Sequence, residues 1–371
     1  MSGPLEGLLV ADFSRVLAGP YATMLLGDMG ATVVKVERPG KGDDTRSWSP
    51  PVDHDGVATY FSAVNRNKHS IALDFDEAED RATARRLADR ADILIENFHA
   101  GSLAERGLGY AEVAASNPGI IYCSISGFGS ANDLPGYDLL VQAMGGLMDI
   151  TGDAHPTKVG VAIVDVVTGL HALSGILAAL HYRDRTGEGQ LLEVTLLGAL
   201  LSSLVNQSAA AVLTGESPTR MGNAHPSIAP YEPFATADRE IVIAVGNDDQ
   251  FTRLCRVLDH ANWATDPRFA TNRARVQHRE QLRTLLTGVL RTRTADEWQA
   301  LLEVQRVPCG PINTVGQALD LAERLGLAPR VEIEGIPQVA HPVSYSRTPA
   351  SYRLRPPSLN EHEPSLDDLL G

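Results

Sequence analysis

The 371-residue sequence has only three cysteines, Cys123, Cys255 and Cys309, and no two of them are close together. Because no CxxC pair is present, the sequence predicts neither a disulfide framework nor a zinc site, and we expect no metal. The N-terminus also lacks a charged segment followed by an apolar one, so no signal peptide is expected. These absences favour a cytoplasmic enzyme.

The chain lacks an excess of positive charge and an uninterrupted membrane span. Its formal net charge of −14 argues against a nucleic-acid partner, because binding to phosphates requires a basic face. The longest apolar stretches, 161–180 and 190–206, contain polar residues such as Asp165 and Glu193, so no membrane partner is expected. The sequence also contains no G-x-G-x-x-G after its first strand and no GxxxxGK[ST], so neither NAD binding nor P-loop chemistry is indicated.

Apolar strands alternate with amphipathic helices in the first 130 residues. This alternation is typical of βαβ units and predicts the α/β class, with a parallel, Rossmann-like sheet. Helices are expected again over 165–183 and from about 198 to 213, with a strand between them at 191–197. The strands expected in the first part of the chain are 7–13, 31–37, 70–75, 92–96 and 120–125, and the helices are 19–29 and 77–90.

Composition shifts divide the chain into domains. The expected large domain covers 1–213, and the polar, turn-rich stretch 214–229 is expected to be a linker. A smaller α/β domain is expected over 230–334, and residues 335–371 form a C-terminal segment that returns to the large domain. Helices of the small domain are expected near 248–258, 278–291 and 295–304, the last with a capping box formed by Thr294 and Glu297.

The stretch VAIVDVVTGLHALSG places one carboxylate, Asp165, near the start of an otherwise apolar helix. It can be interpreted as a helix N-cap that accepts backbone N–H groups. It can also be a nucleophile, and the two interpretations are compatible. The same N–H groups and the helix dipole would hold the carboxylate ionised and oriented, ready to attack an activated acyl group.

Two further sets of residues are candidates for a site. In GYD, Tyr137 follows Gly136, and Gly145 and Gly146 come soon after; this is either a packed glycine turn or a hydrogen-bond donor beside glycine N–H groups that stabilise an oxyanion. Ligands of open α/β sheets bind beyond the carboxyl ends of the strands, and a cluster of cations there could bind the phosphates of a nucleotide-like ligand. The cations at strand ends are Arg15, Lys35, Arg38, Lys68 and Arg106.

Three polar residues later in the chain have structural interpretations. No second histidine or carboxylate stands at metal-ligand spacing from His225, so a structural role is favoured for it. Asp248 and Asp249 stand at an expected helix start, where capping is the default.

Taken in order, these segments resemble the family III CoA-transferases, also called the CaiB/BaiF family, which includes formyl-CoA transferase and alpha-methylacyl-CoA racemase. The resemblance covers nearly the whole chain. It is carried by VADFSRVLAGPYATMLLGDMGATVVKVERPGKGDDTR, NRNKHSIALD, IENFHAGSLAERGLGY, GYDLLVQAMGG, VDVVTGLHALSGILAALHYRDRTGEGQ and GNAHPSIAPYEPF.

The resemblance implies a Rossmann-like large domain, a small domain and an interlocked homodimer. It implies that coenzyme A is moved between carboxylic acids, as a substrate and with no tightly bound cofactor. Asp165 would be the nucleophile and would form an aspartyl anhydride and then an aspartyl-CoA thioester. The positions that match the family's CoA-contacting segments are Val16, Leu17, Ala18, Arg38, Asn97, Phe98 and Arg106.

Two other activities remain open at this stage. A 2-methylacyl-CoA racemase shares the fold but uses a histidine where this chain has Tyr137, and tyrosine is a poor proton acceptor at neutral pH. A non-catalytic acyl-CoA binder is disfavoured because Asp165 is present. The four-glycine run of formyl-CoA transferase is absent, and Arg15 beside the expected CoA loop suggests a dicarboxylate donor such as succinyl-CoA.

Overall fold

The computed structural model describes residues 3–132 and 134–362. The chain forms two compact units: Met1–Leu147, Val159–Ser217 and Gly326–Gly371 make up the first, and Met148–Lys158 and Pro218–Leu325 the second. The predicted large domain therefore contains a segment, 148–158, that belongs to the second unit. The chain rejoins the first unit at Gly326 rather than at 335. Parts of the predicted domains (1–2, 133 and 363–371) lie outside the described residues.

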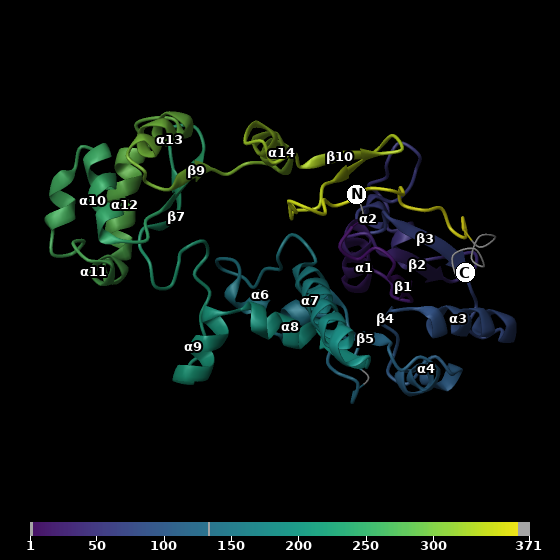
Figure 1. The fold of residues 1–371 in the computed structure, drawn as a ribbon. Coiled ribbons are helices and arrows are strands. Elements are labelled where there is room, and N and C mark those ends of the chain that lie inside the picture. The colour runs from purple at the N-terminus through teal and green to yellow at the C-terminus, as the bar shows by residue number, and fades with distance from the viewer. Residues whose placement is uncertain (1–2, 133, 363–371) are drawn as a thin grey trace. The chain divides into compact units, whose positions relative to one another are not determined.

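A six-stranded parallel sheet with strand order β3-β2-β1-β4-β5-β6 forms the framework of the first unit (Figure 1). The predicted α/β class and parallel sheet are confirmed. The third strand begins two residues before the predicted 70–75, at Lys68, whose ammonium is buried against Asp12. The strands are β1 (Leu9–Asp12), β2 (Thr32–Glu37), β3 (Lys68–Ala72), β4 (Ile93–Glu96), β5 (Ile121–Ser126) and β6 (Gln190–Thr195).

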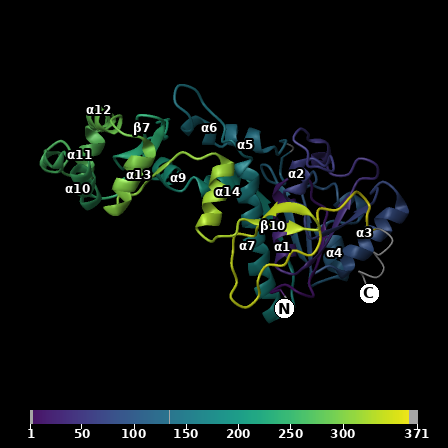
Figure 2. The ribbon, with the colours of Figure 1, turned by 90° about the horizontal axis from the view of Figure 1, so that it is seen from above.

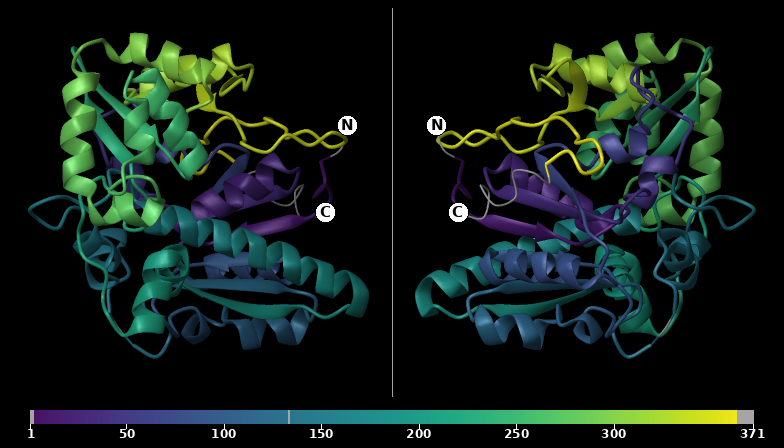
Figure 3. Two further views of the ribbon diagram at one scale, coloured as in Figure 1. Left: turned by 90° about the vertical axis from the view of Figure 1, so that its left-hand side faces the viewer. Right: turned by 90° about the vertical axis from the view of Figure 1, so that its right-hand side faces the viewer.

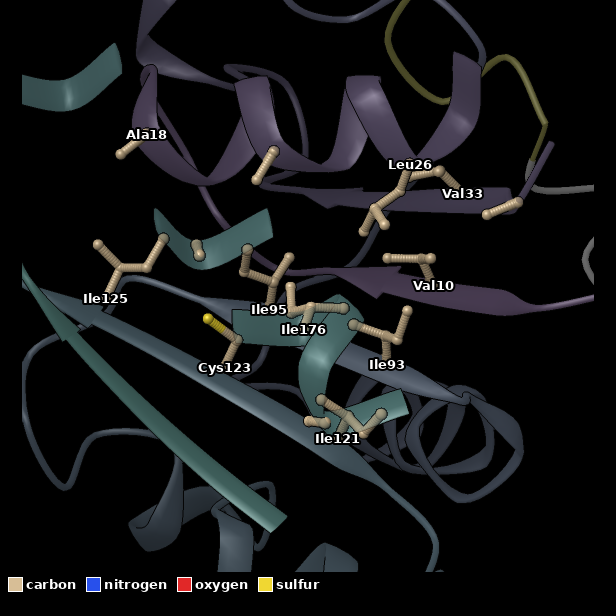
Figure 4. Close-up of a cluster of buried hydrophobic side chains, with 14 of the residues drawn as sticks. Val10, Ala18, Leu26, Val33, Ile93, Ile95, Ile121, Cys123, Ile125 and Ile176 are labelled. Atoms are coloured by element: carbon tan, nitrogen blue, oxygen red, sulfur yellow. The ribbon is translucent and has the colours of Figure 1, made fainter. Parts of the chain in front are cut away.

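Both faces of this sheet are covered by helices, which is why its strands read as nearly continuous apolar runs. Side chains alternate between the two faces, so Val10 lies in one core cluster and Ala11 in the other. The first cluster, part of which Figure 4 shows, packs α1 (Ala18–Asp28) and α7 (Ile163–Thr186) against the sheet. The second packs α3 (Ala78–Arg90) and α4 (Tyr110–Ser116) against the other face.

The long helix α7 runs along the sheet and packs beside α1 (Figure 3). By length and composition α7 is apolar enough to cross a membrane, as is the sharply bent pair α8 (Leu196–Ser203) and α9 (Asn206–Thr214). The contacts of α7 with α1, β5 and β6 identify it as a core helix of the α/β unit. The remaining short helices of the first unit are α2 (Thr59–Ser62) and α5 (Asp138–Met144), and α6 (Leu147–Ile150) begins at the last residue before segment 148–158 of the second unit.

The second unit has a three-stranded antiparallel sheet of order β7-β8-β9 with helices packed on it. The capping box predicted for Thr294 and Glu297 is confirmed. The helix predicted over 278–291 is observed as α12 and is preceded by a separate short helix, α11. The elements are β7 (Tyr231–Ala235), β8 (Glu240–Ala244), β9 (Cys309–Pro311), α10 (Asp248–Val257), α11 (Asn272–Gln277), α12 (Arg279–Leu290), α13 (Ala295–Val304) and α14 (Val315–Arg324).

The segment that follows Gly326 packs on the first unit (Figure 2). It begins with a two-stranded antiparallel ribbon of β10 (Arg330–Ile333) and β11 (Ile336–Val339). The Asn67 side chain accepts the N–H of Arg353 at 2.7 Å, and the N–H of Ser351 donates to the carbonyl of Asp28 at 2.8 Å. These hydrogen bonds fix the segment beside the C-terminal end of α1.

Candidate active site

The carboxyl ends of the parallel strands face one edge of the sheet, and the loops that leave this edge surround a cavity of about 240 Å³. Most of the site residues predicted from the sequence line this cavity. Gly145 and Gly146 do not, and Arg38 and Arg106 line a second cavity instead. Lys35 and Lys68, predicted as part of the same cation cluster, line neither cavity because they are fully buried in ion pairs with Asp43 and Asp12. The predicted residues that the first cavity brings together are Arg15, Val16, Leu17, Ala18, Asn97, Phe98, Gly136, Tyr137 and Asp165.

Asp165 lies in the first turn of α7 but does not cap the helix, so the prediction of an N-cap is wrong. The cap position belongs to Ala162, which has no side-chain acceptor. The acceptor for the helix start is supplied by Asp138, at the start of α5. The Oδ1 atom of Asp138 accepts the N–H of Val164 at 2.7 Å and the N–H of Asp165 at 3.1 Å.

The environment of Asp165 also differs from the predicted one. The side chain is buried, with only 8% of the residue's surface exposed. Burial and the neighbouring charge of Asp138 raise the pKa of Asp165 to about 7. The sequence suggested that the helix start would hold this carboxylate ionised, but a pKa of about 7 means that near neutral pH Asp165 exchanges between its acid and its carboxylate forms.

The loop between β1 and α1 is held from two sides. The amide of Asn97 binds Arg15 twice, accepting its N–H at 2.9 Å and donating to its carbonyl at 2.8 Å. The carboxylate of Asp43 accepts the N–H of Val16 at 3.2 Å and is paired with the buried ammonium of Lys35 at 2.9 Å. Val16 has a φ of +73°, which a β-branched residue rarely adopts, so these contacts impose the conformation of the loop.

Tyr137 reaches the cavity, but 62% of it is exposed, and it serves as the cap residue of α5. Gly136 is needed for packing: a Cβ atom there would lie 2.8 Å from the backbone of Gly127. The N–H of Gly145 already donates to the carbonyl of Val141 at 2.8 Å. The structure therefore gives no support to an oxyanion role for Gly145, and Gly146 lies outside the cavity lining.

A second cavity, of about 520 Å³, lies on the same edge of the sheet, beyond β2 and β3. Arg15 and Phe98 line both cavities. Arg38 pairs with Asp44 at 2.6 Å, and Arg106 pairs with Asp76 at 2.7 Å. The cavity thus combines aromatic rings with guanidinium groups, a composition that suits a base and its phosphates.

Several residues of these cavities were not assigned from the sequence. Lys41 and Phe75 follow the ends of β2 and β3, so the strand-end argument that identified Arg38 would have found them. Asp138 stands in the GYD segment itself, yet nothing local reveals that it binds a helix 26 residues further along. Gly127 carries no signal in the sequence, because only the approach of Gly136 makes it necessary.

Polar residues of the second unit are engaged in structural contacts. Asp248 accepts a hydrogen bond at 2.7 Å from the buried guanidinium of Arg275, and Asn247 is the cap of α10. Asp248 and Asp249 lie in the first turn of that helix, so the prediction that they cap it is wrong. The Nδ1 atom of His225 accepts the N–H of Ser227 at 3.1 Å. Within residues 3–132 and 134–362, no group of His, Cys, Asp and Glu side chains could hold a metal ion.

The chain is similar to known proteins over nearly its whole length. The chain is 44% identical to succinate–glutarate CoA-transferase of Agrobacterium fabrum, covering 97% of this chain and 94% of that protein. It is 40% identical to mouse succinyl-CoA:glutarate CoA-transferase, covering 97% and 84%. A crystal structure of a CaiB/BaiF family protein from Brucella suis is 42% identical, with a TM-score of 0.90 and 100% of both chains covered. The family model described as CoA-transferase family III matches residues 5–363, and this chain belongs to that family.

Proposed function

We propose that this CoA-transferase moves coenzyme A from succinyl-CoA to a second dicarboxylic acid such as glutarate, with Asp165 as the nucleophile. The observation that supports this most directly is the position of Asp165, buried in a cavity that Arg15 also lines. The names of the A. fabrum and mouse relatives suggest the two acids. The guanidinium of Arg15 would bind the carboxylate at the far end of either acid.

Transfer would proceed without net oxidation or loss of a proton. The Asp165 carboxylate attacks the thioester carbonyl and the C–S bond breaks, which gives a mixed succinyl–aspartyl anhydride on the enzyme and the free CoA thiolate. The thiolate attacks the aspartyl carbonyl and releases succinate, which leaves an aspartyl-CoA thioester. The acceptor carboxylate attacks the carbonyl of this thioester and displaces the thiolate, which gives a second mixed anhydride. The thiolate then attacks the acyl carbon of the acceptor, which forms the new CoA thioester and releases the Asp165 carboxylate.

The two cavities would divide the CoA thioester between them. The second cavity would bind the nucleotide of CoA through Phe98 and the guanidinium groups of Arg38 and Arg106. Arg15 and Phe98 line both cavities, and the loop formed by Val16, Leu17 and Ala18 lines the first, where the thioester would meet Asp165. Holding the two reacting groups together replaces a bimolecular encounter, which contributes up to ~7–11 kcal/mol in favourable cases.

The racemase alternative is weaker than CoA transfer. The second acid/base group of a racemase would be Asp248, whose carboxylate is already paired with Arg275. Tyr137 replaces the histidine expected of a racemase. CoA transfer through Asp165 requires neither group.

Arg15→Gln is expected to raise the KM for glutarate about tenfold, because one charge-assisted hydrogen bond contributes ~1.5–3 kcal/mol. The KM for a monocarboxylate such as acetate should change little. A panel of donor CoA thioesters and acceptor acids, read by chromatography of the CoA products, measures both constants. Arg38→Gln is the matched comparison, since Arg38 pairs with the same Asp44 but lies at the second cavity; it should raise the KM for the CoA thioester and leave the KM for glutarate unchanged. Equal losses with mono- and dicarboxylates would contradict the role of Arg15.

We also propose that the protein is cytoplasmic and forms the interlocked homodimer. None of the residues of α9 is buried, and Val212 and Leu213 are each 83% exposed. Exposed apolar side chains gathered on one helix are typical of an interface. Light scattering at micromolar concentration is expected to give twice the chain mass of 39.8 kDa. A mass equal to one chain at that concentration would contradict the dimer.

A further inference from the structure

Asp138 and Asp165 form a pair of carboxylates at the start of α7, and they differ in their hydrogen bonds. Asp138 is fully engaged: its Oδ1 accepts the N–H groups of Val164 and Asp165, and its Oδ2 accepts the side-chain amide of Gln142 at 2.6 Å. Within the described part of the chain, no hydrogen bond reaches the carboxylate of Asp165. The catalytic group proposed above is thus the one that lacks partners.

Gln142 fixes Asp138 in this position. Only 1% of Gln142 is exposed, and its Oε1 accepts the N–H of Val159 at 2.9 Å. Gln142 therefore connects α5 to the loop that leads into α7. Both carboxylate oxygens of Asp138 accept hydrogen bonds, and together these bonds hold the side chain at the start of α7.

The hydrogen bonds of Asp138 change what the helix start can do for Asp165. The N–H groups of the second and third positions of a helix are commonly accepted by the side chain at the N-cap, and free N–H groups of the first turn stabilise negative charge near them. Here Asp138 accepts both N–H groups in place of the N-cap residue Ala162, so neither is left to stabilise the charge of Asp165. A carboxylate without such hydrogen bonds is more basic and more nucleophilic than one that has them.

We propose that Asp138 is a positioning residue for CoA transfer: it occupies the N–H groups of Val164 and Asp165, which leaves the Asp165 carboxylate without backbone hydrogen bonds, and its charge makes that carboxylate more reactive. This inference rests on the proposed function, in which Asp165 is the nucleophile. Attack on the thioester requires only one carboxylate, and a positioning role explains why the second, Asp138, lies beside Asp165. Acylation of Asp165 removes one of the two negative charges, so the repulsion between them favours the acylated state.

Other charged groups also face Asp165. Arg15, Asp44, His99 and Tyr137 line the same cavity. Tyr60 of α2 is close enough that its pKa, raised to about 12 chiefly by burial, also responds to Asp165 and Asp138. Of all these groups, Asp138 is the one whose charge raises the pKa of Asp165, in addition to the effect of burial.

The test is the pH dependence of enzyme acylation. Succinyl-CoA is mixed with excess enzyme at pH values between 5 and 9, the reaction is quenched with acid, and acylated protein is measured by intact mass. Acylation by the natural protein is expected to rise with pH through about 7, because only the ionised form of Asp165 attacks. In Asp138→Asn, whose amide oxygen can still accept the two N–H groups while its NH2 group loses the hydrogen bond from Gln142, the midpoint is expected to fall by about one pH unit, with a several-fold lower plateau.

Asp184→Asn is the matched control, because it removes one negative charge from an exposed position near the other end of α7. It should leave the midpoint and the plateau unchanged. If Asp138→Asn lowers the plateau or the melting temperature but leaves the midpoint in place, Asp138 acts only as a helix cap and the inference is wrong. The same holds if Asp184→Asn shifts the midpoint equally, since the effect would then be one of net charge.

Asp165→Ala separates this inference from the proposed function. If Asp165→Ala still becomes acylated and turns over, the nucleophile assignment fails and the proposed function falls with it. If Asp165→Ala is inactive while the midpoint of Asp138→Asn is unchanged, only the inference about Asp138 fails.

Discussion

Asp165→Asn is expected to lower kcat for CoA transfer by at least about 10³-fold, because removing a covalent nucleophile eliminates the path through the acyl-enzyme. Asparagine has the same shape as aspartate, so the cavity is preserved. Quenched reactions of the natural protein with succinyl-CoA should contain protein heavier by the acyl or CoA group. The variant should contain none.

The same substitution should change the pH dependence of stability in a defined direction. The pKa of Asp165 is about 7 in the folded protein, above the value of 3.8 for a free carboxyl, so the folded state binds this proton more tightly. The natural protein therefore loses stability from this group as pH rises from about 4 to about 7. Asp165→Asn removes the titrating group, so its free energy of unfolding should fall less over that range. Chemical denaturation at pH 5 and pH 8 measures the difference.

Asp184→Asn is again the control for a change of charge on the same helix, and it should retain full activity. A residual kcat within tenfold of the natural value in Asp165→Asn would show that another group carries the acyl transfer. Deamidation of the new asparagine would restore aspartate, so the activity of Asp165→Ala must agree with that of Asp165→Asn.

Local patterns were enough to predict the sheet and one part of the site. Strands buried on both faces are apolar throughout, and the loops at their carboxyl ends follow from the sheet alone, which is why Arg15 was identified. Asn97 and Phe98 were identified from the family resemblance instead. Features that depend on distant residues were missed. The acceptor that caps α7 comes from α5, and the ammonium of Lys68 is buried because Asp12, 56 residues earlier, pairs with it.

The glycines show the same limit. Sequence suggested that Gly136, Gly145 and Gly146 present N–H groups to a substrate. The structure instead requires Gly136 because the backbone of Gly127 approaches it, a contact between two loops that no local pattern encodes. The state of ionisation of Asp165 was misjudged for a related reason, since burial and Asp138 both act through the tertiary structure.

Lys35→Met is expected to lower the free energy of unfolding by ~3–5 kcal/mol, because it leaves the carboxylate of Asp43 buried without its counter-ion. Neither side chain of this pair is exposed, and the two are 2.9 Å apart. Denaturant unfolding at pH 7 measures the loss. Arg253→Met is the control: its partner Asp249 is largely exposed, and such pairs contribute at most about 1 kcal/mol. A loss below about 1 kcal/mol in Lys35→Met would contradict the prediction.

The pH dependence of this pair has the opposite sign to that of Asp165. Burial would raise the pKa of Asp43, but Lys35 and the hydrogen bonds of Thr45 outweigh burial and hold the pKa at about 2. The stability that this carboxylate contributes is therefore present above about pH 4 and is lost as pH falls toward 2. In Lys35→Met that acid-side loss should be smaller, because the pKa of Asp43 moves up when the ammonium is absent.

Loss of this pair should also weaken the binding of CoA thioesters. Asp43 accepts the N–H of Val16, and Lys35 also donates to the carbonyl of Ser14 at 3.0 Å, so the pair holds both sides of the β1–α1 loop. Without Lys35 the strained φ of Val16 can relax, and the KM for succinyl-CoA is expected to rise about tenfold at 20 °C, with a smaller change in kcat. A tenfold fall in kcat with an unchanged KM would show that the loop acts on the chemical step instead. The double variant Lys35→Met/Asp43→Asn should recover part of the lost free energy of unfolding, because the neutral pair no longer requires a counter-ion. Its KM for succinyl-CoA should stay raised, because the N–H of Val16 still lacks its charged acceptor.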